Sequence, residues 1–226
     1  MKKVVVSIGG SILLTGHGDT QYLRSLADLM TTISRKKRLF VVVGGGWLAR
    51  QYIGIARELG TDETYLDMIG IEATRMNAMV MISALKGLSN PMPYDDIEAA
   101  LENGNDFPVV VLCGTTPLQT TDTVAALLAE RVHADLFINA TAVSGVFDRD
   151  PNCDPNAKRF KVLSFDAMEE IVHGTQTKAG SHAPLDPLAS KVVKRARIRT
   201  LVLDGRDLDN LGKAMDGKGC VGTTIG

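Results

Sequence analysis

The chain has 226 residues, 45% of them hydrophobic, and its 25 Lys and Arg residues nearly balance its 26 Asp and Glu residues. This length and apolar content suit one large α/β domain, so we expect a single domain over residues 1–226. The net charge of -1 excludes the basic signature of a nucleic-acid-binding protein, and no apolar run is long enough to cross a membrane.

The cysteines give no sign of disulfides or of a metal centre. Cys113, Cys153 and Cys220 are odd in number and lack metal-ligand spacing, so we expect a reducing, cytoplasmic location and assign no residue as a metal ligand. The basic and then apolar start, MKKVVVSIGGSILL, is interrupted by Gly9 and Gly10. We therefore interpret it as a first strand and not as a signal peptide.

Runs rich in Val, Ile and Leu alternate along the chain with helical patterns. The runs are nearly continuous, as is typical of strands buried on both faces, and the alternation predicts a mostly parallel sheet with helices on both sides, a three-layer αβα sandwich. The tail KGCVGTTIG predicts a short edge strand. In chain order, strands are expected at 3–8, 38–43, 108–113, 135–141 and 199–204, and helices at 22–36, 47–59, 65–88, 95–103, 123–132, 166–172 and 187–197.

Three consecutive glycines follow the second predicted strand, in VVVGGGWLAR at residues 41–50. One interpretation is an anion site, because bare amides and the start of a helix both attract phosphate. The other is a tight turn in which backbones pack closely. Gly44, Gly46 and Ala49 fit a relaxed G-x-G-x-x-A pattern. No acidic residue ends a following strand, so nicotinamide binding is only a minor alternative.

Small or polar residues also follow the other predicted strands. They are SIGGS at 7–11, GTTPLQTTD at 114–122 and ATAVSGVFDRDP at 140–151. Ligands of parallel sheets bind beyond the carboxyl ends of the strands, where these segments should meet.

The order IGGS, VVVGGGWLAR, GTTPLQTTDTVAALLAE, TAVSGVFDRDP and DPLASKVV resembles the amino acid kinase family, and within it the archaeal-type UMP kinases. The resemblance covers essentially the full length. It implies the carbamate kinase-like fold of that family. It also implies transfer of the γ-phosphoryl group of ATP to UMP, giving ADP and UDP with Mg²⁺, in pyrimidine nucleotide biosynthesis.

The same resemblance assigns the phosphate-binding residues. The amides of 7–11 would cradle the phosphates of ATP, Gly45 would face UMP and Gly46 would face ATP. Arg50, one helical turn after Gly46, could reach a phosphate, with an ordinary solvated arginine as the less favoured alternative. The residues of the first segment are Ser7, Ile8, Gly9, Gly10 and Ser11.

For the acceptor, Asp67 matches the position that binds the ribose hydroxyls, although an acidic residue near a helix start needs no function. The segment 114–120 would wrap around UMP, its backbone reading the uracil edge. It consists of Gly114, Thr115, Thr116, Pro117, Leu118, Gln119 and Thr120.

Two further residues are expected to act on the transferred group. Asp122 would orient the catalytic cations, and it also fits a normal first turn of a helix. Lys191 would neutralise the moving phosphoryl group. It lies early in its helix, where the helix dipole does not favour a cation.

Thr141, Phe147 and Asp150 match the adenosine-binding segment, although Phe147 could instead plug the core. Bacterial relatives have a lysine where this chain has Ser7, so we expect Arg50 or Lys3 to supply the missing charge. Ala142 and Ser144 also depart from the family pattern and leave the choice of donor nucleotide open.

The predicted helix at 65–88 carries several methionines and a wide apolar surface, which suggests a contact between subunits. The resemblance implies a homohexamer built as a trimer of dimers. Two alternatives to a UMP kinase remain. One is a related kinase of isopentenyl phosphate or a carboxylate, and the other is a non-catalytic nucleotide-binding protein.

Overall fold

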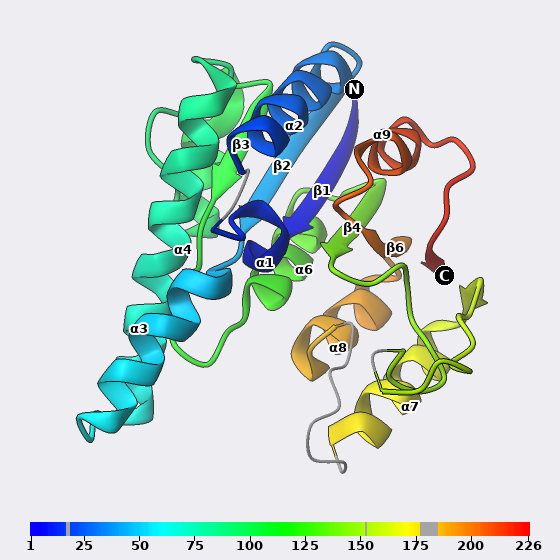
Figure 1. Ribbon diagram of the computed structural model, residues 1–226. Coiled ribbons are helices and arrows are strands. Elements are labelled where there is room, and N and C mark those ends of the chain that lie inside the picture. The colour runs from blue at the N-terminus through cyan, green and yellow to red at the C-terminus, as the bar shows by residue number, and fades with distance from the viewer. Residues whose placement is uncertain (17–18, 152, 177–184) are drawn as a thin grey trace.

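The computed structural model describes residues 1–16, 19–151, 153–176 and 185–226. Its centre is a seven-stranded sheet with the order β3-β2-β1-β4-β6-β7-β5, parallel except where β7 runs antiparallel to β6 (Figure 1). The strands are β1 (Lys2–Ile8), β2 (Lys37–Val43), β3 (Val109–Leu112), β4 (Leu136–Thr141), β5 (Val162–Leu163), β6 (Thr200–Asp204) and β7 (Thr223–Ile225).

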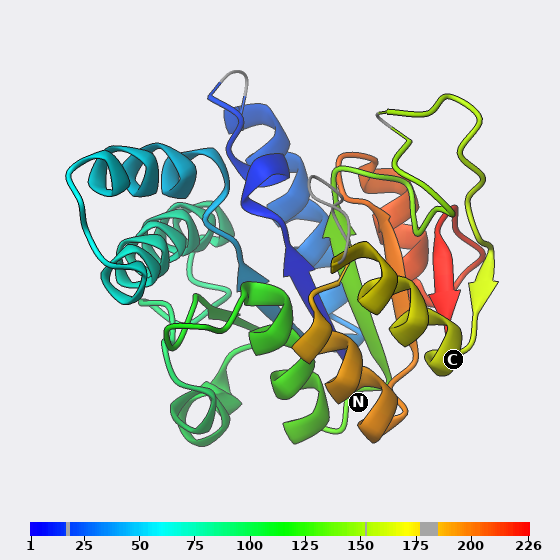
Figure 2. The same ribbon diagram turned by 90° about the horizontal axis from the view of Figure 1, so that it is seen from below.

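Helices cover both faces of this sheet, which Figure 2 shows from the end where the parallel strands point. One buried apolar cluster joins one face to α1 (Gly10–Leu13), α2 (Asp19–Ser34), α4 (Glu63–Leu85) and α9 (Leu208–Asp216). A second joins the other face to α5 (Ile97–Asn103), α6 (Thr121–Arg131), α7 (Phe165–Gln176) and α8 (Pro187–Ala196). The predicted αβα sandwich is confirmed.

The helix α3 (Gly46–Glu58) is not part of either cluster and packs along α4 instead. Gly70 of α4 makes this approach close, because a Cβ there would lie 3.2 Å from the Cδ1 of Ile53. Figure 1 shows the two helices side by side, extending well beyond the sheet.

The structure corrects several predicted elements. The tail does form a strand, but β7 is paired on both sides and β5 lies at the edge, so its predicted edge position is wrong. The helices α1 and α9 and the strand β5 were not predicted. The α4 helix ends at Leu85 and not at residue 88, because Lys86 and Gly87 adopt positive φ values of 50° and 84° and so end the helix.

The register of the strands brings their carboxyl ends together. Ile8, the last residue of β1, is paired with Val43 on one side and with Ala140 on the other. The segments that follow β1, β2 and β4 therefore emerge at one edge of the sheet, as expected. Among the described residues, no helix is both long and apolar enough to cross a membrane.

Candidate active site

The two glycine-rich segments touch each other main chain to main chain. A Cβ placed on Gly10 would lie 2.3 Å from the amide nitrogen of Gly46 and 2.4 Å from the carbonyl oxygen of Gly44. Real Cβ atoms do not come this close to backbone atoms, so side chains are excluded from this contact. Close backbone packing, one of the two interpretations of the triple glycine, is therefore present.

This packing places two helix starts beside each other. Gly9 and Gly45 precede the first residues of α1 and α3, and Gly46 adopts a φ of 59° that suits glycine. The first amides of a helix have no partner within the helix and attract anions. The close packing thus produces a bare main-chain floor, while the anion-site interpretation of the triple glycine stays a prediction.

Asn77 of α4 supports this floor from behind. Its side-chain amide donates to the carbonyl oxygens of Gly44, at 2.8 Å, and of Gly45, at 3.0 Å. Both carbonyls are thereby turned towards α4. Asn77 was not expected from the sequence, because one polar residue inside a long helix gives no distinctive signal.

A carboxylate lies beneath the end of β1. Asp122 accepts hydrogen bonds from the hydroxyl of Ser7, at 2.8 Å, and from the side-chain amide of Asn139, at 3.2 Å. Ser7 and Asn139 are direct neighbours across β1 and β4, so their side chains share the face that α6 covers. Ser7 is completely buried, and its side chain therefore serves Asp122 rather than the surface.

Burial of Asp122 raises its pKa to about 6, and the negative charge of Asp186 adds to this effect. The hydrogen bonds from Ser7 and Asn139 lower the pKa and only partly offset the burial. Within the described part of the chain, the groups that act on Asp122 are thus neutral or negative. A cation bound next to Asp122 would therefore stabilise the ionised form of its carboxylate.

The predicted acceptor segment is held by two residues of α4. Thr74 accepts from the amide of Gly114 at 2.7 Å, and Asp67 accepts from the amide of Leu118 at 2.9 Å. Leu118 has a φ of 67° and an almost fully exposed side chain, so the segment forms a tight loop beside α4. Thr74 is a second residue that the sequence reasoning missed.

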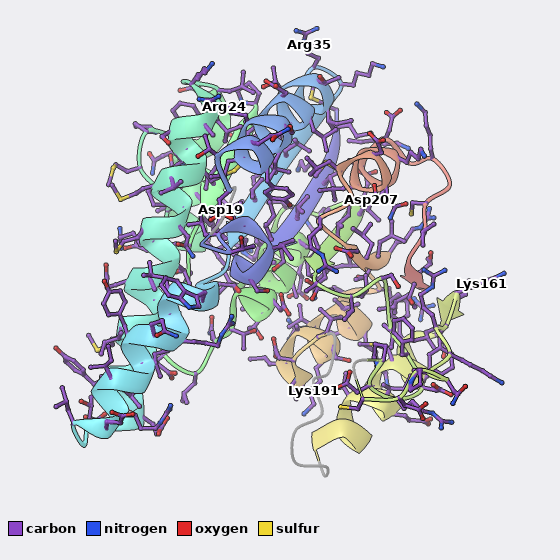
Figure 3. The ribbon with its side chains drawn as sticks, in the orientation of Figure 1. Asp19, Arg24, Arg35, Lys161, Lys191 and Asp207 are labelled. Carbon is purple, nitrogen blue, oxygen red and sulfur yellow. The ribbon has the colours of Figure 1, made fainter. Side chains whose placement is uncertain are left out.

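Arg50 and Lys191 are both exposed, on α3 and α8, and Figure 3 labels Lys191. Within the part of the chain that the structure describes, neither side chain has a hydrogen bond or an ion pair. Lys191 helps to lower the pKa of Glu169 on α7, but the hydrogen bond from Lys194 is the main cause. Lys194, and not Lys191, holds α7 to α8.

The predicted adenosine residues lie on the other side of the site. Thr141 ends β4 and accepts from the amide of Gly205 at 2.9 Å. Phe147 and Asp150 belong to the loop after β4, where Phe147 bridges to Arg159. Figures 1 and 2 both show this loop beyond β6, far from α3.

One expectation is wrong. Lys3 cannot replace a lysine at position 7, because its ammonium group donates to the carbonyl of Val132 at 2.8 Å. It lies near the start of β1, at the opposite end of the strand from Ser7. Of the two candidates for the missing charge, only Arg50 lies at the correct edge of the sheet.

Comparison with known proteins supports the family that the sequence motifs suggested. Residues 2–204 match the model of the amino acid kinase family. The chain is 45% identical to a uridylate kinase of Archaeoglobus fulgidus over 99% of both chains, and 45% identical to a uridylate kinase of Methanothrix thermoacetophila over 95% of both.

Solved structures agree with this result. The crystal structure of the Archaeoglobus fulgidus uridylate kinase has a TM-score of 0.90 and 43% identity over the whole of both chains. The UMP kinase of Ureaplasma parvum, with a TM-score of 0.77 and 24% identity over 99% of this chain and 98% of that one, shares the fold. With its sheet, its paired glycine-rich segments and a family match over nearly its whole length, this chain belongs to the amino acid kinase family.

Proposed function

We propose that the chain is a UMP kinase, which transfers the γ-phosphoryl group of ATP to UMP and releases ADP and UDP. The observation that carries this proposal is the contact of Gly10 with Gly44 and Gly46, which builds one floor from the two glycine-rich segments. The names of the relatives supply the acceptor. The role in pyrimidine nucleotide synthesis follows from this reaction.

The donor would lie over α1 and the acceptor over the start of α3. The amides of Gly10 and Ser11 would hold the phosphates of ATP. The amide of Gly9, also expected to face ATP, instead donates to the carbonyl of Ala140 at 3.0 Å, so Gly9 would shape the strand end beneath the phosphates together with Ser7 and Ile8. Gly46 would contribute to the same side, and Gly45 would face UMP. Two phosphates that share one floor meet end to end, which is the geometry that phosphoryl transfer requires.

The acceptor would be held by the loop that α4 anchors. The segment from Gly114 to Thr120 would surround the base and the sugar of UMP, and Asp67 would reach the ribose while it fixes the amide of Leu118. Thr141, Phe147 and Asp150 would receive the adenosine of ATP. In this arrangement the two bases would lie on opposite sides of the floor.

Positive charge around the moving group would come from Lys191 and Arg50. A phosphoryl group in flight spreads negative charge over its oxygens, and fixed cations lower the barrier. Both side chains are exposed and have no bonded partner in the described part of the chain, so they are available for phosphate.

The residues also fit Mg²⁺, which kinases usually hold through one or two carboxylates and the phosphates of the substrate. Asp122, which accepts from the neutral side chains of Ser7 and Asn139, would hold it. Among the described residues, no group of three acidic or metal-binding side chains forms a complete protein cage. Bound there with ATP, the ion would neutralise phosphate oxygens.

We also propose a cytoplasmic homo-oligomer, with the hexamer built from dimers that the family resemblance implies. Large apolar side chains are exposed along α3 and α4, as is typical of surfaces that another subunit covers. They are Trp47, Tyr52, Ile55, Leu59, Tyr65, Met68, Met76, Met79 and Val80.

The release of ADP from ATP tests the reaction, measured with UMP, CMP, AMP, isopentenyl phosphate and acetate as separate acceptors in the presence of Mg²⁺. We expect turnover that depends on UMP. Turnover with another acceptor alone would identify a different kinase of the family. Binding of nucleotides without turnover in any arm would show a non-catalytic protein.

A further inference from the structure

Asp186 connects the two parts of the site that are expected to act on UMP and on the moving phosphoryl group. It is the residue before α8, and its carboxylate accepts from the amides of Leu188, at 2.8 Å, and Ala189, at 3.0 Å. These bonds satisfy two of the free amides at the start of the helix. Asp186 thus fixes the end of the helix that carries Lys191.

The same carboxylate reaches the start of α6. It accepts from the hydroxyl of Thr123 at 2.8 and 2.9 Å and from the hydroxyl of Thr120 at 2.5 Å. Thr120 is the last residue of the acceptor loop, and its hydroxyl oxygen accepts from the amide of Thr123 at 3.1 Å. One carboxylate therefore caps α8 directly and α6 through Thr120.

Two other capping aspartates in the described part of the chain lack the second set of bonds. Asp96 and Asp207 also precede helices and accept from one backbone amide each, of Ala99 and of Asn210. No hydroxyl of another element donates to either of them within the described ranges. The bonds from Thr120 and Thr123 are thus an addition to the ordinary cap, and they join the acceptor loop to α8.

We infer that Asp186 is a positioning residue that transmits occupation of the acceptor loop to α8, so that Lys191 is placed when UMP is bound; this inference rests on the proposed function. Hydrogen bonds to a charged acceptor are the stronger kind. A shift of Thr120 on UMP binding is therefore passed to the start of α8 through a single rigid group. Lys191 follows one helical turn later.

The substitution Asp186→Ser separates the cap from the connection. Serine caps helices about as well as aspartate, so α8 stays folded. Its shorter side chain cannot also reach the hydroxyls of Thr120 and Thr123. The matched control is Asp207→Ser, which makes the same change at the start of α9, a separate element in Figure 3.

The experiment compares the wild-type chain and both variants by steady-state kinetics and by amide hydrogen exchange with and without UMP. In Asp186→Ser we expect kcat to fall about 10- to 100-fold, the scale of lost hydrogen bonds to a charged group, with KM for ATP unchanged. UMP should protect α8 in the wild-type chain and in Asp207→Ser, but only the acceptor loop in Asp186→Ser.

A second variant guards against an effect on folding alone. Thr123→Val removes the hydroxyl without changing the shape of the side chain, and it should lower kcat in the wild-type chain but much less when combined with Asp186→Ser. Independent, additive losses would overturn the inference.

The remaining outcomes are also decisive. Protection of α8 by UMP in Asp186→Ser, or a kcat equal to that of Asp207→Ser, would overturn the inference and leave the proposed function standing. A wild-type chain without UMP-dependent turnover would overturn the proposed function, and the inference with it.

Discussion

Gly46 lies so close to Gly10 that a Cβ on Gly46 would be 2.2 Å from the carbonyl carbon of Gly10. The two glycines come from different strand ends, 36 positions apart in the numbering of the chain, and neither can carry a side chain without moving the other's backbone. The contact is therefore a structural requirement of the sheet edge and, at the same time, the base of the proposed site.

The first prediction concerns stability. Gly10→Ala should lower the free energy of unfolding by about 3 kcal/mol or more, because the added methyl group meets backbone and not a flexible side chain. Gly54→Ala, inside α3 with nothing within 4 Å of the added carbon, should raise it by about 0.5–1 kcal/mol. Urea denaturation measures both. Equal stabilities of the two variants would contradict the contact.

The second prediction concerns Lys191. Lys191→Ala should lower kcat by roughly 10²–10³-fold, because one fixed positive charge near the transferred group is lost. Lys213→Ala, which removes an exposed cation from α9, should leave kcat unchanged. Steady-state assays of ADP release compare the two. Near-normal turnover of Lys191→Ala would exclude the assigned role.

The third prediction concerns pH. Because burial raises the pKa of Asp122 to about 6, its carboxylate becomes protonated as the pH falls through that value. If the charged form attracts the catalytic cations, kcat/KM should decrease below pH 6, and Asp122→Asn should be slow at every pH. A wild-type profile that is flat between pH 5 and about 7 would contradict this role, since this range spans the expected titration.

The raised pKa of Asp122 also makes the free energy of unfolding depend on pH. The folded chain keeps a proton on Asp122 that the unfolded chain, at the usual value of 3.8, has already released. The contribution of Asp122 to stability therefore falls as the pH rises from 3.8 to about 6. A catalytic group held at a cost to stability is common in active sites.

The fourth prediction concerns assembly. Ile55→Glu on α3 and Met76→Glu on α4, tested singly, should reduce the molar mass in solution, because each places a charge in the proposed subunit contact. Val221→Glu changes an exposed apolar residue outside these helices and serves as the control. Size-exclusion chromatography with light scattering gives the masses. A monomeric wild-type chain would disprove the assembly.

Much of the fold could be predicted from the sequence, because the five longest strands are continuous apolar runs with turn residues at their ends. The two shortest strands, β5 and β7, span two and three residues. The tail predicted β7, but two residues are too few for β5 to show a pattern, and the pairing that places β5 rather than β7 at the edge is a long-range property. The helix α9 also escaped prediction, although its polar and apolar residues alternate with a helical period.

The site, like the fold, has features that the local sequence predicts and features that depend on long-range contacts. The sequence indicated that Gly44, Gly45 and Gly46 leave a bare backbone, but it could not show that Gly10 is their neighbour. Asn77 supports the floor through Gly44, and Thr74 supports the loop through Gly114. Each of these residues lies on α4, more than 30 positions along the chain from the glycine that it contacts. A single polar residue in a helix has no spacing that reveals such a partner.

Asp186 begins the motif DPLASKVV, yet only its bonds to Thr120 and Thr123 distinguish it from an ordinary cap. Those bonds depend on the packing of α6 against α8, which no local pattern encodes.

The most direct test of the central claim is a crystal structure of the chain with UMP and a non-hydrolysable ATP analogue bound together. We expect the γ-phosphate of the analogue and the phosphate of UMP to lie over the same main-chain amides, those of Gly10, Gly45 and Gly46, with Lys191 directed at the gap between them. Phosphates bound on separate surfaces, with these amides facing only protein or solvent, would contradict the account.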